Sequence, residues 1–228
     1  MGEEKPLKKM AEAFTELANA INSQSPNGGE ARLDLGPFSR ACSFVSPLFR
    51  CLGIAFKFAE LDYVAKVDDL LEASKSISTI PVMMDGDIEA KCVQRAGSHT
   101  RNLLRVKRGI DMVKVLFEHM IASDGNSLKD PASKAYVQVF APYHGWAIRK
   151  AVGAGMYALP TKAQLLKKLN EDETSARIQM QNFIASAAPV ILYVDQLFMS
   201  RELGIDWQIK YGPALIKPKH KLSSNVIA

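Results

Sequence analysis

Charged side chains fall at helical spacing in three separate stretches of the sequence, each beside apolar residues. They are Arg101, Arg105 and Arg108 in one stretch, Asp62 and Lys66 in a second, and His144 in a third. Residues three or four apart lie on the same face of a helix. A guanidinium group binds phosphate oxygens in a planar fork, and a carboxylate or an imidazole makes single, directed hydrogen bonds. The concurrence of the three stretches suggests a polar site beside an apolar surface, without deciding what it binds.

The stripe that carries the three arginines changes character along its length. It continues into Met112, Val115 and Leu116, and a second apolar face holds Leu103, Val106, Ile110, Val113 and Phe117. A helix that is apolar on two sides lies between two layers. The remaining face, with Lys107, Asp111, Lys114 and Glu118, is typical of a solvated stripe with opposite-charge pairs.

Each of the three charged features also has an ordinary explanation. Asp62 and Lys66 could form a surface pair, and His144, after Pro142, could start a helix or lie satisfied in the core. The arginines could form a surface patch or bind the phosphates of a nucleic acid. An enzyme would use Asp62 and His144 as an acid–base pair, but we find no metal-ligand cluster, phosphate loop or nucleophile beside a base.

The composition describes an ordinary globular protein. The 228 residues are 47% hydrophobic and 23% charged, with a formal net charge of +5. We expect no membrane span, because no apolar run reaches the required length, and the N-terminus lacks the apolar core of a signal peptide. The three cysteines, Cys42, Cys51 and Cys92, lack metal-ligand spacing. They are therefore expected to be reduced, buried thiols in a cytosolic protein.

Helical periodicity runs through almost the whole chain. The expected helices cover 5–22, 38–50, 53–77, 86–96, 98–122, 132–140, 142–157, 162–170 and 171–201. Thr161 should cap the helix that follows it, and Pro189 should kink the last helix without ending it. We find no alternating strand pattern. These features predict a single all-α domain of about eight helices over residues 1–207, followed by a basic, mobile tail over 208–228.

Two segments are candidates for contact with a membrane. Trp146 points away from His144 on its expected helix and stands near Arg149 and Lys150, a combination typical of the membrane interface. The alternative is that Trp146 packs in the core. The segment 76–84 is expected to be a second apolar element, in a surface loop.

Three short motifs resemble the glycolipid transfer protein family. They are "LDYVAK" (61–66), "TRNLLRVKRG" (100–109) and "APYHGW" (141–146), and the resemblance extends to the closing "LGIDW" (203–207). It implies a two-layer helical sandwich that encloses one sphingolipid and uses no nucleotide, metal, cofactor or covalent chemistry. It also implies that Asp62 accepts hydrogen bonds from the ceramide amide and a hydroxyl, that His144 donates to the ceramide carbonyl, and that Lys66, Arg101 and Arg105 hold the headgroup.

Two departures from the sugar-binding branch of that family favour a phosphate headgroup. The sugar-binding branch has a Trp where this chain has Arg105, and an Asn where it has Lys66. A neutral sugar would leave both cations without partners. A phosphate monoester carries about −1.5 to −2, whereas the three cations and Asp62 sum to about +2. Arg108 is expected to add to the electrostatic field rather than to contact the phosphate.

The resemblance therefore implies the ceramide-1-phosphate branch, with ceramide-1-phosphate or its phytoceramide form as the guest. Such an amphiphile would place its phosphate against the arginines and its hydrocarbon beside Met112 and Leu116. We expect a cytoplasmic monomer that touches membranes transiently, transfers the lipid without ATP or metal ions, and binds no nucleic acid. The chain resembles a plant member of that branch, which implies a link to restraint of plant cell death. The alternative is a helical module that binds a protein or a nucleic acid through the arginine stripe.

Overall fold

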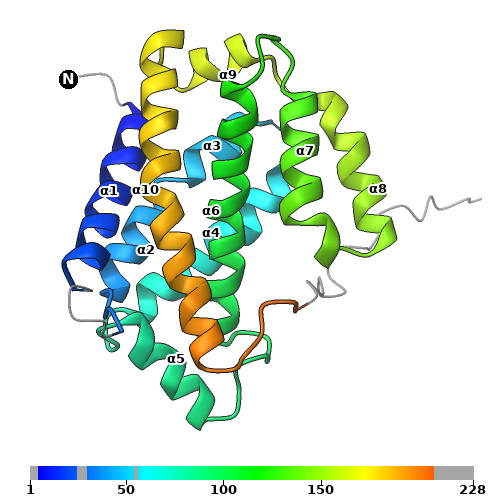
Figure 1. Ribbon diagram of the computed structural model, residues 1–228. Coiled ribbons are helices and arrows are strands. Elements are labelled where there is room, and N and C mark those ends of the chain that lie inside the picture. The colour runs from blue at the N-terminus through cyan, green and yellow to red at the C-terminus, as the bar shows by residue number, and fades with distance from the viewer. Residues whose placement is uncertain (1–4, 25–29, 54–55, 208–228) are drawn as a thin grey trace, which may run out of the picture.

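The computed structural model describes residues 5–24, 30–53 and 56–207, so the expected tail over 208–228 lies outside the described residues. The named secondary-structure elements of the described chain are all helices (Figure 1). The α-helices are α1 (Pro6–Gln24), α2 (Leu35–Ser43), α3 (Ser46–Cys51), α4 (Lys57–Ala73), α5 (Ile80–Glu89), α6 (His99–Ile121), α7 (Lys129–Val139), α8 (Trp146–Gly155), α9 (Lys162–Lys168) and α10 (Glu173–Ser200). Two short 3-10 helices are η2 (Ala141–Tyr143) and η3 (Met156–Ala158). The all-α prediction is confirmed.

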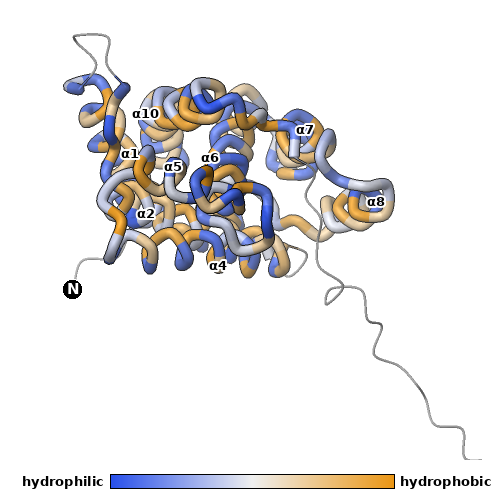
Figure 2. The backbone as a smooth tube through the Cα atoms, turned by 90° about the horizontal axis from the view of Figure 1, so that it is seen from below, coloured by the Kyte–Doolittle hydropathy of each residue, from blue (hydrophilic) through white to orange (hydrophobic). Residues whose placement is uncertain are grey.

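The helices form two layers. Helix α6 contacts α7 and α10 on one side and α4 on the other, while α1 contacts both α10 and α2. In Figure 2 the helices are viewed from below, with α10 and α7 along one side and α2 and α4 along the other. This arrangement confirms the predicted two-layer sandwich.

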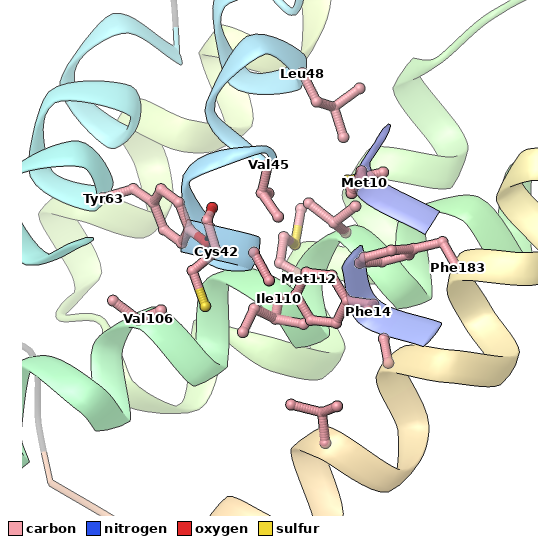
Figure 3. Close-up of a cluster of buried hydrophobic side chains, with 14 of the residues drawn as sticks. Met10, Phe14, Cys42, Val45, Leu48, Tyr63, Val106, Ile110, Met112 and Phe183 are labelled. Carbon is pink, nitrogen blue, oxygen red and sulfur yellow. Dashed lines mark hydrogen bonds between the residues drawn. The ribbon is translucent and has the colours of Figure 1, made fainter. Parts of the chain in front are cut away.

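One hydrophobic core lies between the layers, and α6 contributes to it from two sides. All eight apolar residues that the two stripes of α6 were predicted to present are buried. Phe183 of α10 meets the edges of two other rings, with its centroid 4.9 Å from Phe14 and 5.7 Å from Phe117. Figure 3 shows Phe14 and Phe183 in this cluster. The periodicity of the sequence therefore predicted the two buried faces of α6 correctly.

The expected charged face of α6 is only partly solvated. Lys114 and Glu118 do form the predicted i,i+4 pair, at 2.8 Å. Lys107, however, is buried and pairs with Asp195 of α10, also at 2.8 Å. The expectation failed there because a partner 88 positions away in the chain replaces water, and local spacing carries no sign of it.

Two of the helices predicted in the first half of the chain, over 38–50 and 86–96, differ most from the observed ones. The pattern over 38–50 contains two helices, α2 and α3, with Pro47 in the first turn of α3. The helix expected over 86–96 is instead α5, which covers Ile80–Glu89 and has Pro81 in its first turn, where a missing N–H costs no hydrogen bond. In the segment 76–84, Met83 and Met84 are buried in α5 and Val82 is 50% exposed, so the expected apolar surface loop is wrong except at Val82.

The second half of the chain brings one further correction that concerns a site residue. His144 does not lie on a helix: its φ of −102° and ψ of 134° are extended, and α8 begins only at Trp146. The flanking Pro142 and Gly145 divide the expected helix into η2, an extended residue and α8. Thr161 caps α9 as predicted, and α10 continues through Pro189 without ending.

Helix α10 is long and apolar enough to span a membrane by length and composition alone, contrary to the expectation that no run would be. Its most apolar window is 44% buried inside the protein. The buried side includes Phe183, Val190, Val194 and Phe198, which belong to the core. We therefore assign α10 to the core of the sandwich.

Candidate functional site

Tyr63 and Gly109 set the distance between α4 and α6. A Cβ atom at Gly109 would lie 2.5 Å from Cε2 of Tyr63, so only glycine lets that ring lie against α6. The hydroxyl of Tyr63 donates to the carbonyl of Cys42 at 2.9 Å and ties α4 to α2 (Figure 3). This close approach brings Asp62, next to Tyr63, opposite Arg105, which lies one turn before Gly109.

Asp62 is bracketed by two cations. Nη2 of Arg105 donates to Oδ2 of Asp62 at 2.7 Å, and Nζ of Lys66 lies 3.6 Å from Oδ1. The three side chains are partly buried, with 28%, 13% and 23% of their areas exposed for Asp62, Arg105 and Lys66. The structure thus brings together three of the predicted site residues as a compact cluster with a net positive charge.

Arg101 lies one turn before Arg105 on α6 and is half-buried. Its backbone N–H donates to the side chain of the N-cap residue Ser98. Within the described parts of the chain its guanidinium forms no hydrogen bond or ion pair, unlike that of Arg105. Arg101 is therefore the cation of this cluster whose donors are least committed to the protein itself.

His144 is buried beside this cluster and is neutral at pH 7. Burial, followed by the charges of Arg105 and Arg108, lowers the pKa of His144 to about 4, and Asp62 opposes the shift. Nδ1 lies 2.9 Å from the hydroxyl of Tyr136, and the ring stacks on Phe140. A tyrosine hydroxyl that donates to Nδ1 leaves the hydrogen on Nε2. In that tautomer Nε2 is the hydrogen-bond donor of the ring.

Arg108 has a different role from the other two arginines. It is 3% exposed, its guanidinium donates to the carbonyls of Ile205 and Trp207, and its face lies 3.6 Å from the centroid of the Tyr143 ring. Burial lowers its pKa. With Arg108 buried and Arg105 paired, the three arginines do not form the continuous exposed stripe that a protein- or nucleic-acid-binding module would use.

Trp146 is exposed at the start of α8. Its relative exposure is 70%, so the alternative of a packed core tryptophan is wrong. Nζ of Lys150, one turn later, lies 6.0 Å from the ring centroid. None of the residues of α8 is buried. The amphipathic indole is thus available to the surroundings of the protein.

Several residues that support the site were missed by sequence reasoning. Asp69, two turns after Asp62 on α4, accepts hydrogen bonds from Asn102 at 2.7 Å and shares a 2.9 Å contact with Nδ1 of His99. Asp87 accepts hydrogen bonds from the N–H of Thr100 and the hydroxyl of Ser98 at the start of α6. Asp69 has a signal in its seven-residue spacing from Asp62. Tyr136 and Asp87 have none, because their partners come from other segments.

No group of three or more histidine, cysteine, aspartate or glutamate side chains could hold a metal ion within the described ranges. Cys42 is buried, and burial raises the pKa of its thiol. Cys51 and Cys92 are also free thiols but are only half-buried, so the expectation of burial holds for Cys42 alone.

Comparison with known proteins places the chain. A profile described as glycolipid transfer protein matches residues 33–171. The chain is 67% identical to Accelerated cell death 11 of Arabidopsis thaliana over 205 aligned residues. The alignment covers 90% of this chain and 97% of that relative. A second Arabidopsis protein, described as its homolog, is 47% identical over 89% of both chains. The chain therefore belongs to the glycolipid transfer protein family.

Solved structures agree with this assignment. A crystal structure of a mutant of the same Arabidopsis protein, complexed with a ceramide-1-phosphate, matches with a TM-score of 0.86 over 90% of this chain and 99% of that chain. Human ceramide-1-phosphate transfer protein, also solved with ceramide-1-phosphate, has a TM-score of 0.69 at 18% identity over 85% and 96% of the two chains. At that identity the likeness concerns the fold alone.

Proposed function

We propose that this protein carries ceramide-1-phosphate, or its phytoceramide form, between membranes as a monomer, without covalent chemistry or cofactors. The observation that carries the proposal is the cluster of Asp62, Lys66 and Arg105 beside the neutral His144, with Arg101 one turn away. The Arabidopsis relative crystallised with this lipid supports it. We infer a single lipid-transfer domain over residues 1–207.

The phosphate would meet the cationic side of the cluster. Lys66, Arg101, Arg105 and Asp62 together carry about +2, and a phosphate monoester carries about −1.5 to −2. Arg105 donates to Asp62 through Nη2, and the planar fork of a guanidinium group matches the geometry of phosphate oxygens. Arg101 would contribute donors that no described part of the chain uses. A neutral sugar in the same place would leave these cations without a counter-charge.

The protein would bind the ceramide amide with one hydrogen-bond acceptor and one donor. The carboxylate of Asp62 lies beside two cations and would accept a hydrogen bond from the amide N–H. Neutral His144 would donate through Nε2 to the amide carbonyl, in the tautomer in which Nδ1 accepts from the Tyr136 hydroxyl. A protonated His144 would add a fourth positive charge, and its low pKa avoids this at cytoplasmic pH.

The hydrocarbon chains explain why a protein is needed for transfer. Burial of one methylene contributes ~0.8 kcal/mol, so a chain of some 15 methylenes would need on the order of 12 kcal/mol to enter water. Apolar side chains that replace bilayer contacts remove most of this cost. Met112 and Leu116 continue the arginine stripe into the apolar interior of the sandwich. Because the two environments are nearly balanced, transfer needs no ATP.

Contact with the membrane would involve exposed apolar residues near the site. Trp146 follows His144 by two residues and is 70% exposed. Phe58, one turn before Asp62 on α4, and Leu61, its neighbour, are 66% and 53% exposed. We propose that these three residues touch the bilayer transiently from the cytoplasmic side. The link to plant cell death is inferred from the name of the Arabidopsis relative.

A vesicle-to-vesicle fluorescence assay tests the proposal directly. Wild-type protein should move labelled ceramide-1-phosphate quickly and labelled galactosylceramide hardly at all, because the sugar leaves buried donors unpaired. The rate should not change when EDTA is added. Equal rates for the two lipids would contradict the headgroup assignment, and loss of transfer in EDTA with intact helical circular dichroism would contradict metal-independent transfer.

A further inference from the structure

Arg108 joins three parts of the molecule that are separate in sequence. On the donor side, Nη1 donates to the carbonyl of Trp207 at 3.0 Å and Nη2 to that of Ile205 at 2.5 Å. On its flat side, the guanidinium carbon lies 3.6 Å from the centroid of the Tyr143 ring. A planar guanidinium can do both at once, because its donors lie in the plane and its face stacks on an aromatic ring.

The segment 203–207, which we call the C-terminal strap, is itself well anchored. Glu202 and Gly204 adopt left-handed conformations, with φ of 54° and 65°, and redirect the chain at the end of α10. Nε1 of Trp207 donates to the carbonyl of Leu203 at 3.1 Å, and the ring meets that of Phe198 edge-on. In Figure 1 the strap is the orange segment that leaves α10 and passes the lower end of α6.

Tyr143 connects Arg108 and the C-terminal strap to His144. It is the last residue of η2, its N–H donates to the carbonyl of Phe140 at 3.0 Å, and His144 follows it directly. Phe140 and Tyr136, which contact the imidazole, come from the α7 side. The contact of Tyr143 with Arg108 adds a tie to α6, the helix that carries Arg101 and Arg105.

We propose that the C-terminal strap and Arg108 are positioning elements of the headgroup site, which hold Tyr143 and thereby fix His144 relative to Arg105. The donors of Arg108 serve the strap, so Arg108 acts through His144 rather than on the phosphate. The proposal rests on the proposed function for the identity of the ligand. The placement of His144, however, can be measured in the protein without lipid.

The test compares three variants of the full-length chain by NMR titration of His144 and by affinity for short-chain ceramide-1-phosphate. Arg108→Lys keeps the charge but loses the fork and the stacking. Gly204→Val alters the strap alone, because no atom lies within 4 Å of a Cβ there and the positive φ strains a branched residue. Both should raise the pKa of His144 from about 4 toward 6.5 and weaken binding about tenfold.

Arg201→Lys is the matched control. Arg201 also anchors the end of α10, with bonds to Glu30 at 2.8 Å and Asp85 at 2.7 Å, but it does not contact Tyr143. This variant should lower the melting temperature and leave the titration of His144 unchanged. A pKa that stays near 4 in Arg108→Lys and Gly204→Val, with affinity within about twofold of wild type, would overturn the proposal and leave the strap a purely structural element.

Substitution of Tyr143 tests whether its ring links Arg108 to the placement of His144. Tyr143→Phe keeps the ring under Arg108 and should titrate like wild type at His144, whereas Tyr143→Leu should resemble Arg108→Lys. Equal behaviour of Phe and Leu would contradict the role of the ring. If wild-type protein failed to bind ceramide-1-phosphate while Arg108→Lys still shifted the titration of His144, the proposed function would fail and the positioning role would stand.

Discussion

Helices α6 and α8 both carry residues of the proposed transfer site, but the protein holds them very differently. Fifteen of the 23 residues of α6 are buried, and helices of both layers surround it. None of the ten residues of α8 is buried. A headgroup-binding site needs side chains whose positions are fixed to a fraction of an ångström, whereas a membrane-docking element must be exposed and must dissociate again. We infer that binding is encoded in α6 together with α4, and docking in α8.

If α6 determines selection, reversing the charge of Arg105 should have the largest effect of any single change. Truncation of one partner in a buried charge pair costs about 2–5 kcal/mol, or about 30- to 5,000-fold in affinity, and reversal should cost more. Arg105→Glu should therefore abolish transfer of ceramide-1-phosphate between vesicles. Lys75→Glu makes the same change in net charge at an exposed position, with 71% of the side chain accessible, and should transfer normally. A phosphate lipid that Arg105→Glu still carried would refute the headgroup assignment.

The buried His144 should make stability depend on pH in a defined window. Its pKa is about 4 in the folded protein and near 6.5 in the unfolded chain, so the unfolded state binds the extra proton between these values. The stability that His144 confers is therefore fully present above pH 6.5 and is lost as the pH falls toward 4, by about 3 kcal/mol. This loss can be measured from the free energies of urea unfolding of wild type and His144→Gln across this pH range. Parallel curves for the two proteins would contradict the burial of a neutral imidazole.

Asp62 should affect all sphingolipids alike, because the contact proposed for it is to the ceramide amide. Asp62→Val should weaken ceramide-1-phosphate and ceramide binding together, by about tenfold or more for the loss of a charged hydrogen bond. The protein should stay folded by helical circular dichroism, although loss of the ion pair with Arg105 should lower the melting temperature. Affinities of the two lipids, measured separately, decide the matter. A loss confined to the phosphate lipid would assign Asp62 to the headgroup instead.

The two helices also differ in how far the sequence alone predicts them. The faces of α6 follow from a 3.6-residue period, because packing on two sides leaves an apolar pattern in the sequence. The start of α8 does not, since Pro142 and Gly145 interrupt the expected helix and place His144 in extended backbone. The roles of Arg108 and Lys107 depend on partners about 90 to 100 positions away, Trp207 and Asp195. Motif resemblance indicated the site residues, and local pattern could not indicate what holds them.

The smallest expected effect concerns α8 and tests the other half of the comparison. Trp146→Ala should slow transfer about threefold to tenfold, because an interfacial tryptophan contributes on the order of 1 kcal/mol to docking. It should leave the affinity for short-chain ceramide-1-phosphate in solution unchanged. The melting temperature should also hold, since exposed substitutions change the free energy of unfolding by no more than about 0.5 kcal/mol.

Tyr157→Ala is the matched control for Trp146→Ala. Tyr157 is 76% exposed, lies beyond the other end of α8, and has Nζ of Lys129 3.8 Å from its ring centroid. Equal slowing by both variants would mean that exposed aromatic area, rather than the position of Trp146 beside the headgroup site, sets the rate. A fall in lipid affinity for Trp146→Ala would show that α8 takes part in binding, and the division of roles between the two helices would then be wrong.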